Sequence, residues 1–276
     1  MKKICFALLP LILILNSCSA TPRPAPTIAS APRQEPSPTN TPLPVTPVES
    51  AFAPANPTAA PPDDIVESHT VSFETPDGAM IAGELYGSGE KAIIFSVMGN
   101  CKPGWRGLAQ LTAAQGLMAL TYPWRGCRES GVSEQDELQK FVDDTRGAID
   151  FVHGQGAEQI ILAGASLGGL ASAKLAIESG ASGLIVVASP PSIPEWGFEI
   201  EAADLNTDIP KLFITAENDP TVPASASREL YDLAAEPKEW QTYPENKHGT
   251  DIFETESGEA MQARILEFIL RIASTQ

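Results

Sequence analysis

Short apolar runs alternate with longer amphipathic stretches over most of the chain after residue 65. Apolar runs of about four to eight residues between turn residues predict buried strands, and apolar residues spaced three and four apart predict helices. The predicted strands are residues 71–75, 80–86, 92–97, 117–122, 159–163, 184–188, 211–215 and 240–243. The predicted helices are residues 107–115, 135–153 (with Ser133 as a cap), 167–179, 224–235 and 258–272. This alternation predicts an α/β fold with a mostly parallel central sheet and helices on both faces.

The first seventeen residues have the pattern of a targeting segment. Lys2 and Lys3 precede the apolar run 4–15, which is shorter than the roughly 20 residues that span a bilayer as a helix. The run ends in Leu15-Asn16-Ser17-Cys18, which resembles the cleavage box of bacterial lipoproteins. The resemblance implies cleavage before Cys18, lipid on Cys18, and a membrane-anchored chain that lies outside the cytoplasm. An uncleaved signal anchor is the alternative and would leave the chain on the same side.

Residues 19–64 are rich in Pro, Thr, Ser and Ala and hold 13 of the 25 prolines. Proline lacks a backbone N–H and favours extended conformations, so this stretch is not expected to build a core. At about 3.1 Å per residue it could extend to roughly 140 Å. We interpret residues 18–64 as a lipidated cysteine with a disordered tether, and residues 65–276 as one domain. A ligand for proline-recognising domains is the alternative.

A serine flanked by glycines stands where the predicted strand 159–163 meets the predicted helix 167–179. Residues 164–169 read G-A-S-L-G-G and match the G-x-S-x-G nucleophile elbow. The chain therefore resembles the α/β-hydrolase family, in particular its small serine esterases without a cap (the dienelactone-hydrolase-like branch). The resemblance covers about residues 66–273 and implies that Ser166 is the nucleophile. A turn of small residues that allows close helix packing is the alternative.

A serine nucleophile needs a base, and the chain has three histidines. His248 lies between the last predicted strand and the last predicted helix, which is where the family carries its catalytic histidine. His69 and His153 are interpreted as structural. Asp219 follows the seventh predicted strand, in the loop that carries the family's acid, and the order Ser, Asp, His is also the family's order. Glu217, two residues earlier, is the main competitor for the role of the acid.

Acyl transfer also needs backbone amides that point at the oxygen of the attacked carbonyl. The resemblance assigns this role to the amide of Leu167, next to the nucleophile, and to the amide of Asn100 in the loop after the third predicted strand. Met98 stands where many relatives have the histidine of a His-Gly pair. An ordinary glycine turn at this loop is the alternative.

Cys101 and Cys127 follow neighbouring parallel strands if the family topology holds. Their placement and an extracytoplasmic location favour a disulfide between them. We hypothesise that this bond fixes the loop of Asn100 against the next strand. Two unpaired buried cysteines are the alternative, and the spacing is not that of a zinc site.

The acidic composition excludes some partners. The formal net charge is −17, which argues against nucleic acid as a ligand and against docking to anionic lipid through a basic patch. Membrane contact is expected only through the N-terminal lipid.

The resemblance implies that an ester of small size is cleaved through an acyl-enzyme, with His248 as the base and without a metal or an organic cofactor. A thioester or an amide is the alternative bond. A lipoprotein of the same fold that only binds a ligand is the competing class, and a peptidase of this fold is another alternative.

Only 22 residues separate the predicted strands that end at 188 and begin at 211, which is too few for a full helical cap. The sequence therefore predicts an open pocket. Its candidate edges are Trp105, Trp124, Trp196 and Phe198, with core packing as the alternative for each.

Overall fold

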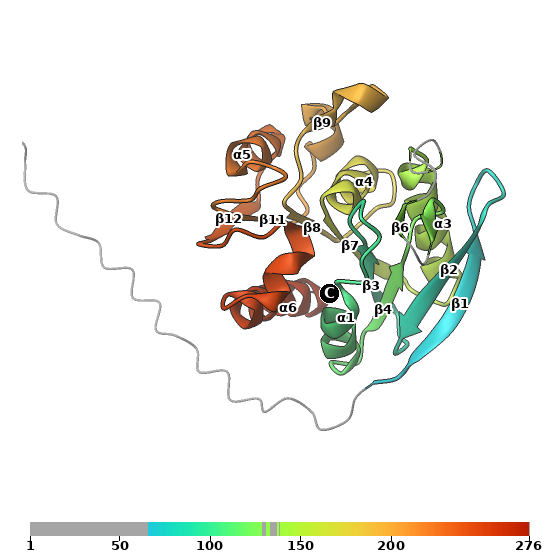
Figure 1. The fold of residues 1–276 in the computed structure, drawn as a ribbon. Coiled ribbons are helices and arrows are strands. Elements are labelled where there is room, and N and C mark those ends of the chain that lie inside the picture. Colours follow the sequence, from blue (N-terminus) through green and yellow to red (C-terminus); the bar gives the residue numbers. More distant parts are fainter. Residues whose placement is uncertain (1–65, 129–130, 133–136, 138, 276) are drawn as a thin grey trace, which may run out of the picture. The chain divides into compact units, whose positions relative to one another are not determined.

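The computed structural model describes residues 66–128, 131–132, 137 and 139–275. An eight-stranded sheet forms its centre, in the order β1-β2-β4-β3-β7-β8-β11-β12 (Figure 1). The strands of this sheet are β1 Ser68–Glu74, β2 Met80–Tyr86, β3 Lys91–Ser96, β4 Met118–Tyr122, β7 Gln159–Ala165, β8 Gly183–Val187, β11 Lys211–Ala216 and β12 Lys238–Tyr243.

The sheet is mostly parallel, as the sequence predicts. Strand β2 is antiparallel to both of its neighbours, β1 and β4, while every pair from β4 to β12 is parallel. All residues of β4 and β8 are buried. Burial on both faces explains why these strands read as continuous apolar runs instead of alternating patterns.

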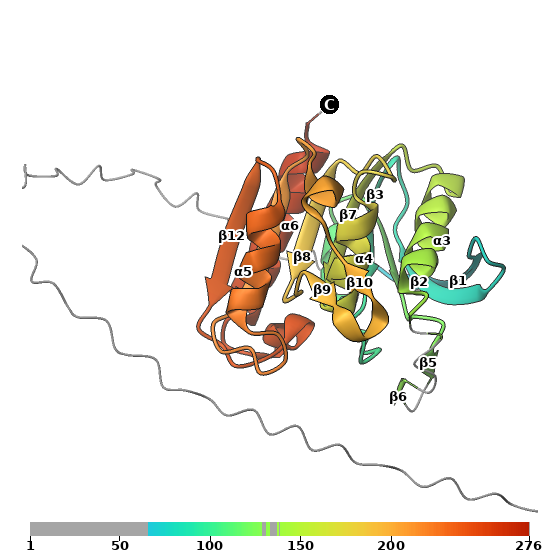
Figure 2. The same ribbon diagram turned by 90° about the horizontal axis from the view of Figure 1, so that it is seen from above.

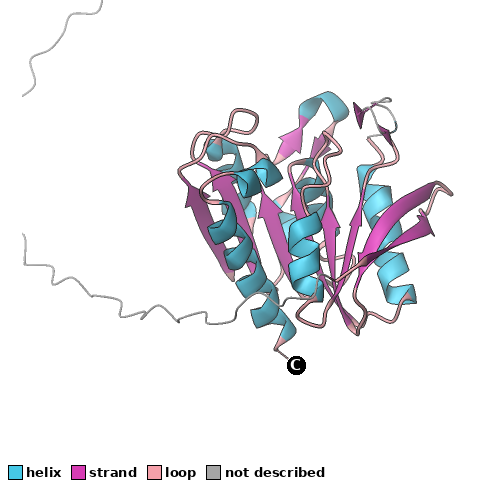
Figure 3. Ribbon diagram, turned by 60° about the horizontal axis from the view of Figure 1, so that its bottom comes forward, coloured by secondary structure: helices cyan, strands magenta, loops and turns pink. Residues whose placement is uncertain are grey.

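Helices cover both faces of the sheet (Figures 2 and 3). The helices are α1 Arg106–Ala113, α3 Phe141–Gly154, α4 Leu167–Leu175, α5 Ala224–Leu233 and α6 Gly258–Ala273. Helices α1 and α6 pack together on one face, and α3, α4 and α5 lie on the other, where α3 contacts α4. None of the helices in the described ranges is long and apolar enough to cross a membrane.

Two predicted helix boundaries differ from the structure. Helix α3 begins at Phe141, whereas the sequence pattern starts it at residue 135; Ser133, the predicted cap, lies outside the described residues. Gln139 and Lys140 are exposed, so only from Phe141 does the helix have an apolar face to bury. Helix α4 ends at Leu175 and continues as turns to Gly180, whose φ is +62°.

Short elements fill the connections at the edge where the parallel strands end. The connection from β8 to β11 contains β9 Ser192–Ile193, η1 Pro194–Trp196, β10 Phe198–Glu199 and η2 Ala202–Leu205. The connection after β4 contains β5 Cys127–Arg128 and β6 Gly131–Val132, and η3 Gly249–Glu254 precedes α6. The predicted lack of a large cap is confirmed. The β9–β10 hairpin (residues 192–199) projects beyond the edge of the sheet (Figure 1), and its residues Ile193 and Trp196 line a pocket there, so that pocket is covered in part.

Candidate active site

Ser166 occupies the turn between β7 and α4 with φ 53° and ψ −116°. A positive φ is rare for a residue with a side chain and costs about 1–3 kcal/mol, so the surrounding structure must hold it. The Ser166 amide donates to the carbonyl of Val187 at 2.8 Å, and the Ser189 hydroxyl donates to the Ser166 carbonyl at 2.9 Å. The end of β8 therefore holds the backbone of the turn from both sides.

The glycines around Ser166 are required by close backbone contacts. A Cβ on Gly164 would lie 2.1 Å from the carbonyl oxygen of Gly168, and a Cβ on Gly168 would lie 2.2 Å from that of Ser96. Side chains at these positions would push α4 away from β7 and β3. The motif thus has the steric basis that the nucleophile-elbow interpretation requires.

Asp219 and His248 follow the adjacent parallel strands β11 and β12 and contact each other. His248 Nδ1 lies 2.8 Å from Oδ2 and 3.0 Å from Oδ1 of Asp219. The Asp219 carboxylate is fully buried, and the His248 side chain is 13% exposed. The amides of Thr221 and Val222 donate to Asp219 Oδ1 at 2.8 and 2.9 Å. An Nδ1–H bonded to this fixed carboxylate leaves Nε2 of His248 free to act as a base.

The other predicted candidates for the base and the acid lie elsewhere. Glu217 is exposed, and its amide donates to the Tyr243 carbonyl. His69 lies exposed on β1. His153 lies in the last turn of α3, with Nδ1 2.7 Å from the carbonyl oxygen of Ala157.

The loop that carries His248 packs against the elbow. Gly249 has φ 56°, and a Cβ there would lie 3.4 Å from Cβ of Ala165, the residue before Ser166. The same Cβ would lie 2.4 Å from the sulfur of Met98, so Met98 fills the space beneath the histidine loop. Residues 166, 219 and 248 thus come together at the carboxyl ends of β7, β11 and β12, the edge where ligands bind in parallel sheets.

Of the two predicted oxyanion residues, Leu167 directly follows Ser166, and Asn100 follows Gly99, which lines the same cavity as Ser166. Leu167 is the first residue of α4, and a Cβ on Gly99 would lie 3.7 Å from the Leu167 side chain, so the β3–α1 loop (residues 97–105) packs on the elbow. Neither the Leu167 amide nor the Asn100 amide donates a hydrogen bond to another residue in the described ranges. Both remain available to a carbonyl oxygen.

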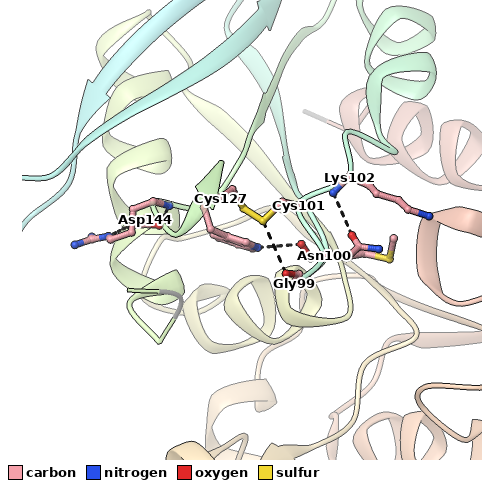
Figure 4. Close-up of a disulfide and its surroundings, with 9 residues drawn as sticks. Gly99, Asn100, Cys101, Lys102, Cys127 and Asp144 are labelled. Atoms are coloured by element: carbon pink, nitrogen blue, oxygen red, sulfur yellow. Dashed lines mark hydrogen bonds and ion pairs between the residues drawn. A yellow bond between two sulfur atoms is a disulfide. The ribbon is translucent and has the colours of Figure 1, made fainter. Parts of the chain in front are cut away.

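A disulfide joins Cys101 of the β3–α1 loop to Cys127 of β5, with the two Cα atoms 5.6 Å apart (Figure 4). Cys101 has φ 64° and directly follows Asn100. The Cys101 amide and the Trp124 indole N–H both donate to the Met98 carbonyl, at 3.0 and 3.2 Å. The β3–α1 loop is therefore held to the segment after β4 by one covalent bond and one indole hydrogen bond.

Arg125 fixes the segment after β4 by bonding to two aspartates, Asp144 and Asp77. Its Nε donates to Asp144 Oδ1 at 2.5 Å and its amide donates to Asp144 Oδ2 at 2.9 Å, and the Asp144 carboxylate on α3 is fully buried. Its guanidinium also pairs with Asp77 at 2.5 Å. Hydrogen bonds from Arg125 hold the pKa of Asp77 below its usual range, while burial raises the pKa of Asp144. The segment of Cys127 is thus tied to α3.

A cavity of about 210 Å³ opens beside Ser166. It is lined by Gly99, Ser166, Leu167, Leu170, Pro190, Ile193, Trp196 and Val222. Of the predicted edge residues, only Trp196 lines it. Sequence reasoning missed Ile193 and Pro190, because the short hairpin that places Ile193 has no periodic pattern of its own.

Trp105 and Trp124 do not line the cavity, which corrects the sequence prediction. Both are almost fully buried. Trp105 stacks on Phe95 with ring centres 5.1 Å apart, and its indole N–H donates to the Ser96 carbonyl at 3.0 Å. Phe198 packs on Phe141 of α3 at 4.9 Å, so it anchors the hairpin and does not edge the pocket.

A larger cavity of about 350 Å³ is lined by residues of β1, β2, β4 and the β3–α1 loop, including Cys101. It contains none of the three residues 166, 219 and 248. Its charged groups, Glu84 and Arg106, pair with each other at 2.6 Å. The cavity that contains Ser166 is therefore the candidate active site, although it is the smaller of the two.

In the described ranges, no three His, Cys, Asp or Glu side chains cluster in a way that could hold a metal ion.

No family model matches the sequence, and no curated protein matches it. Solved structures resemble the fold. An esterase domain from Rhodothermus marinus is 19% identical, with a TM-score of 0.57 over 73% of this chain and 99% of that one. An esterase from Pyrococcus furiosus is 16% identical, with a TM-score of 0.59 over 75% and 93%. A protein of unknown function from Staphylococcus aureus is 12% identical, with a TM-score of 0.59 over 74% and 99%.

These likenesses and the strand order show that the chain has the α/β-hydrolase fold without a large cap. The predicted fold class is confirmed. At such low identity the likeness shows the fold alone, so the chemistry must be argued from the site.

Proposed function

We propose that this chain is a serine hydrolase that cleaves carboxylic esters, or thioesters, through an acyl-enzyme. The observation that carries the proposal is the buried Asp219 carboxylate bonded to Nδ1 of His248, in a loop packed against the strained turn of Ser166. A surface histidine needs no buried acid, and a structural turn needs no partly exposed serine with a positive φ. The pair and the turn together support the proposal that His248 activates the Ser166 hydroxyl.

In the proposed reaction His248 accepts the proton of the Ser166 hydroxyl while the oxygen attacks the substrate carbonyl. The buried Asp219 carboxylate stabilises the imidazolium that forms. The amides of Leu167 and Asn100 donate to the developing oxyanion. His248 then protonates the leaving alcohol or thiol, and a water molecule, deprotonated by His248, releases the acyl group and restores Ser166.

Several of the similar solved structures are named esterases, and this supports an ester as the bond that is cleaved. The short connection between β8 and β11 supports a place among the small cap-less serine esterases, in the dienelactone-hydrolase-like branch. A small-molecule ester is therefore the proposed substrate, and the cycle uses only the residues named above.

We also propose that the enzyme works outside the cytoplasm, attached to a membrane through lipid on Cys18 and held away from it by the tether of residues 19–64. The lipoprotein-like segment at residues 15–18 supports the anchor. The Cys101–Cys127 disulfide supports the location, because such bonds persist in oxidising compartments. Mass spectrometry of the N-terminal peptide should show a cleaved, lipidated Cys18 in the parent chain, and an uncleaved N-terminus without lipid in the Cys18→Ser variant.

The catalytic proposal is tested by exposing the full chain in detergent to a fluorophosphonate probe, followed by intact-mass measurement and peptide mapping. A single adduct on Ser166 is expected, and Ser166→Ala should show none. If the folded parent chain at neutral pH forms no adduct, the serine is not activated. The chain would then be a binding protein with a hydrolase fold.

A further inference from the structure

We infer that the cavity beside Ser166 holds the acyl group of the substrate, that it admits short uncharged acyl groups, and that Trp196 sets its length limit. The inference rests on the proposed function and names the substrate class of the same site. It is carried by the position, size and lining of the cavity and by the packing of the β9–β10 hairpin.

The position of the cavity assigns it to the acyl side. The leaving group must lie beside the imidazole of His248, because that ring donates a proton to it. His248 is absent from the described residues that line the cavity, whereas Gly99 of the β3–α1 loop and Leu167 line it. The cavity therefore runs from Gly99 and Leu167 on the oxyanion side, past Ser166, to Val222, and the His248 ring does not line it. A substrate whose leaving group faces His248 would place its acyl chain there.

The size of the cavity limits the acyl chain. Its volume of about 210 Å³ is below the roughly 300–1,000 Å³ of pockets that enclose drug-sized ligands. At about 30 Å³ for each water-sized group, it has room for at most about seven such groups, and for fewer once packing gaps are counted. Acyl chains of about two to six carbons fit this space, and longer chains must pass the hairpin.

The lining excludes a charged acyl group. Apart from Gly99 and Ser166, the cavity is lined by the apolar side chains of Leu167, Leu170, Pro190, Ile193, Trp196 and Val222. Among the described residues no lysine or arginine lines it, so a carboxylate on the acyl chain would lose its hydration without gaining a partner there. The net charge of −17 also disfavours substrates with a carboxylate.

Trp196 lines the cavity and belongs to a hairpin that is anchored to the core. Phe198 packs on the buried Phe141 of α3 with ring centres 4.9 Å apart, and Trp196 lies 6.2 Å from the same ring. Lys174 of α4 pairs with Asp204 at 2.8 Å at the base of the hairpin. Trp196 itself is only partly buried, so its removal should lengthen the cavity without collapsing the core.

The test measures kcat/KM of the full chain for p-nitrophenyl esters with acyl chains from two to ten carbons, and for acetates of alcohols of increasing length. The parent chain should prefer about two to six acyl carbons. Trp196→Ala should move the upper limit by two or more carbons, with a gain of about fourfold in kcat/KM for each methylene newly admitted. The alcohol series should keep its profile.

Glu195→Ala serves as the matched control, because Glu195 is exposed on the same short helix and does not line the cavity. It should leave both profiles as they are. Trp196→Leu, with a thermal unfolding midpoint close to that of the parent chain, replaces the alanine variant if that variant does not fold.

An acyl profile that Trp196→Ala or Trp196→Leu leaves unchanged, or a shift confined to the alcohol series, would overturn the acyl-pocket inference while ester cleavage stands. A parent chain that cleaves acyl groups of ten carbons, or acyl groups with a carboxylate, as fast as acetate would also overturn it. Failure to cleave any ester, with no fluorophosphonate adduct on Ser166, would instead overturn the proposed function itself.

Discussion

The two sides of Ser166 are held in place by different means. On the base side, Asp219 and His248 come from adjacent parallel strands, and the amides two and three residues after Asp219 fix its carboxylate. On the oxyanion side, the loop of Asn100 is held by Cys127 and Trp124. Each of these lies 26 residues after the residue that it contacts, Cys101 or Met98.

In the proposed mechanism this difference separates the activation of Ser166 from the binding of the oxyanion. The base side is built from local hydrogen bonds and strand pairing, so it forms whenever the sheet forms. The oxyanion side needs a disulfide and an indole N–H from another segment, and that segment is itself fixed by Arg125 and Asp144. Breaking the disulfide or the indole hydrogen bond should therefore displace the loop of Asn100 and leave the Asp219–His248 pair intact.

The largest expected effect is on the base side. Asp219→Asn should lower kcat by about 10⁴-fold, because an amide cannot hold the productive tautomer of His248 or stabilise its charged form. Steady-state kinetics with a short acyl ester, such as p-nitrophenyl acetate, measures this loss. The Glu217→Gln variant is the matched control, since Glu217 is exposed and two residues away. Equal losses in both variants would contradict the assignment of Asp219 as the acid.

An intermediate effect is expected from the disulfide. Reduction of Cys101–Cys127, or the double change Cys101→Ser with Cys127→Ser, should lower kcat by about 10²-fold, because displacing an oxyanion donor has an effect of that size. KM should change less than threefold. Closing a loop with a sequence separation of 26 residues also contributes about 3–4 kcal/mol to the free energy of unfolding. Activity should therefore be measured well below the lowered unfolding midpoint.

A pH–rate profile separates the two sides in the same experiment. If reduction loosens only the oxyanion side, the acid limb of the kcat/KM profile should stay in place, and reoxidation should restore kcat. A disulfide that only stabilises the fold would leave kcat unchanged in the folded, reduced enzyme. That result would remove its role in positioning Asn100.

Each part of the proposed base side has a local signal in the sequence. The glycines at 164 and 168 mark a turn that a side chain would block, and His248 and Asp219 each follow a strand whose apolar run is easily read. The fold could be predicted from the apolar runs, because strands that are buried on both faces appear in the sequence as continuous apolar segments.

The parts that the sequence did not predict depend on contacts between distant segments. Trp124 and Trp105 look alike in the sequence, and only packing shows that both are buried and that Trp124 donates to Met98. The β9–β10 hairpin consists of two-residue strands, which are too short for a hydrophobic period, so the place of Ile193 in the cavity had no sequence signal.

The smallest expected effect tests the indole contact alone. Trp124→Phe keeps an aromatic ring but removes the N–H that donates to the Met98 carbonyl, which is a loss of about 1 kcal/mol. If that bond positions the β3–α1 loop, kcat should fall about fivefold with little change in KM. The measurement is steady-state kinetics with the thermal unfolding midpoint taken in parallel.

Tyr122→Phe is the matched control for this change, since it keeps a buried aromatic ring and removes a hydroxyl on β4, outside the loop, that hydrogen-bonds with the hydroxyls of Ser96 and Thr145. Both variants should lose about the same stability, and only Trp124→Phe should lose kcat. Because the two losses in stability match, a difference in kcat isolates the position of the loop from general packing. Equal kcat in the two variants would mean that the disulfide by itself holds Asn100 in place.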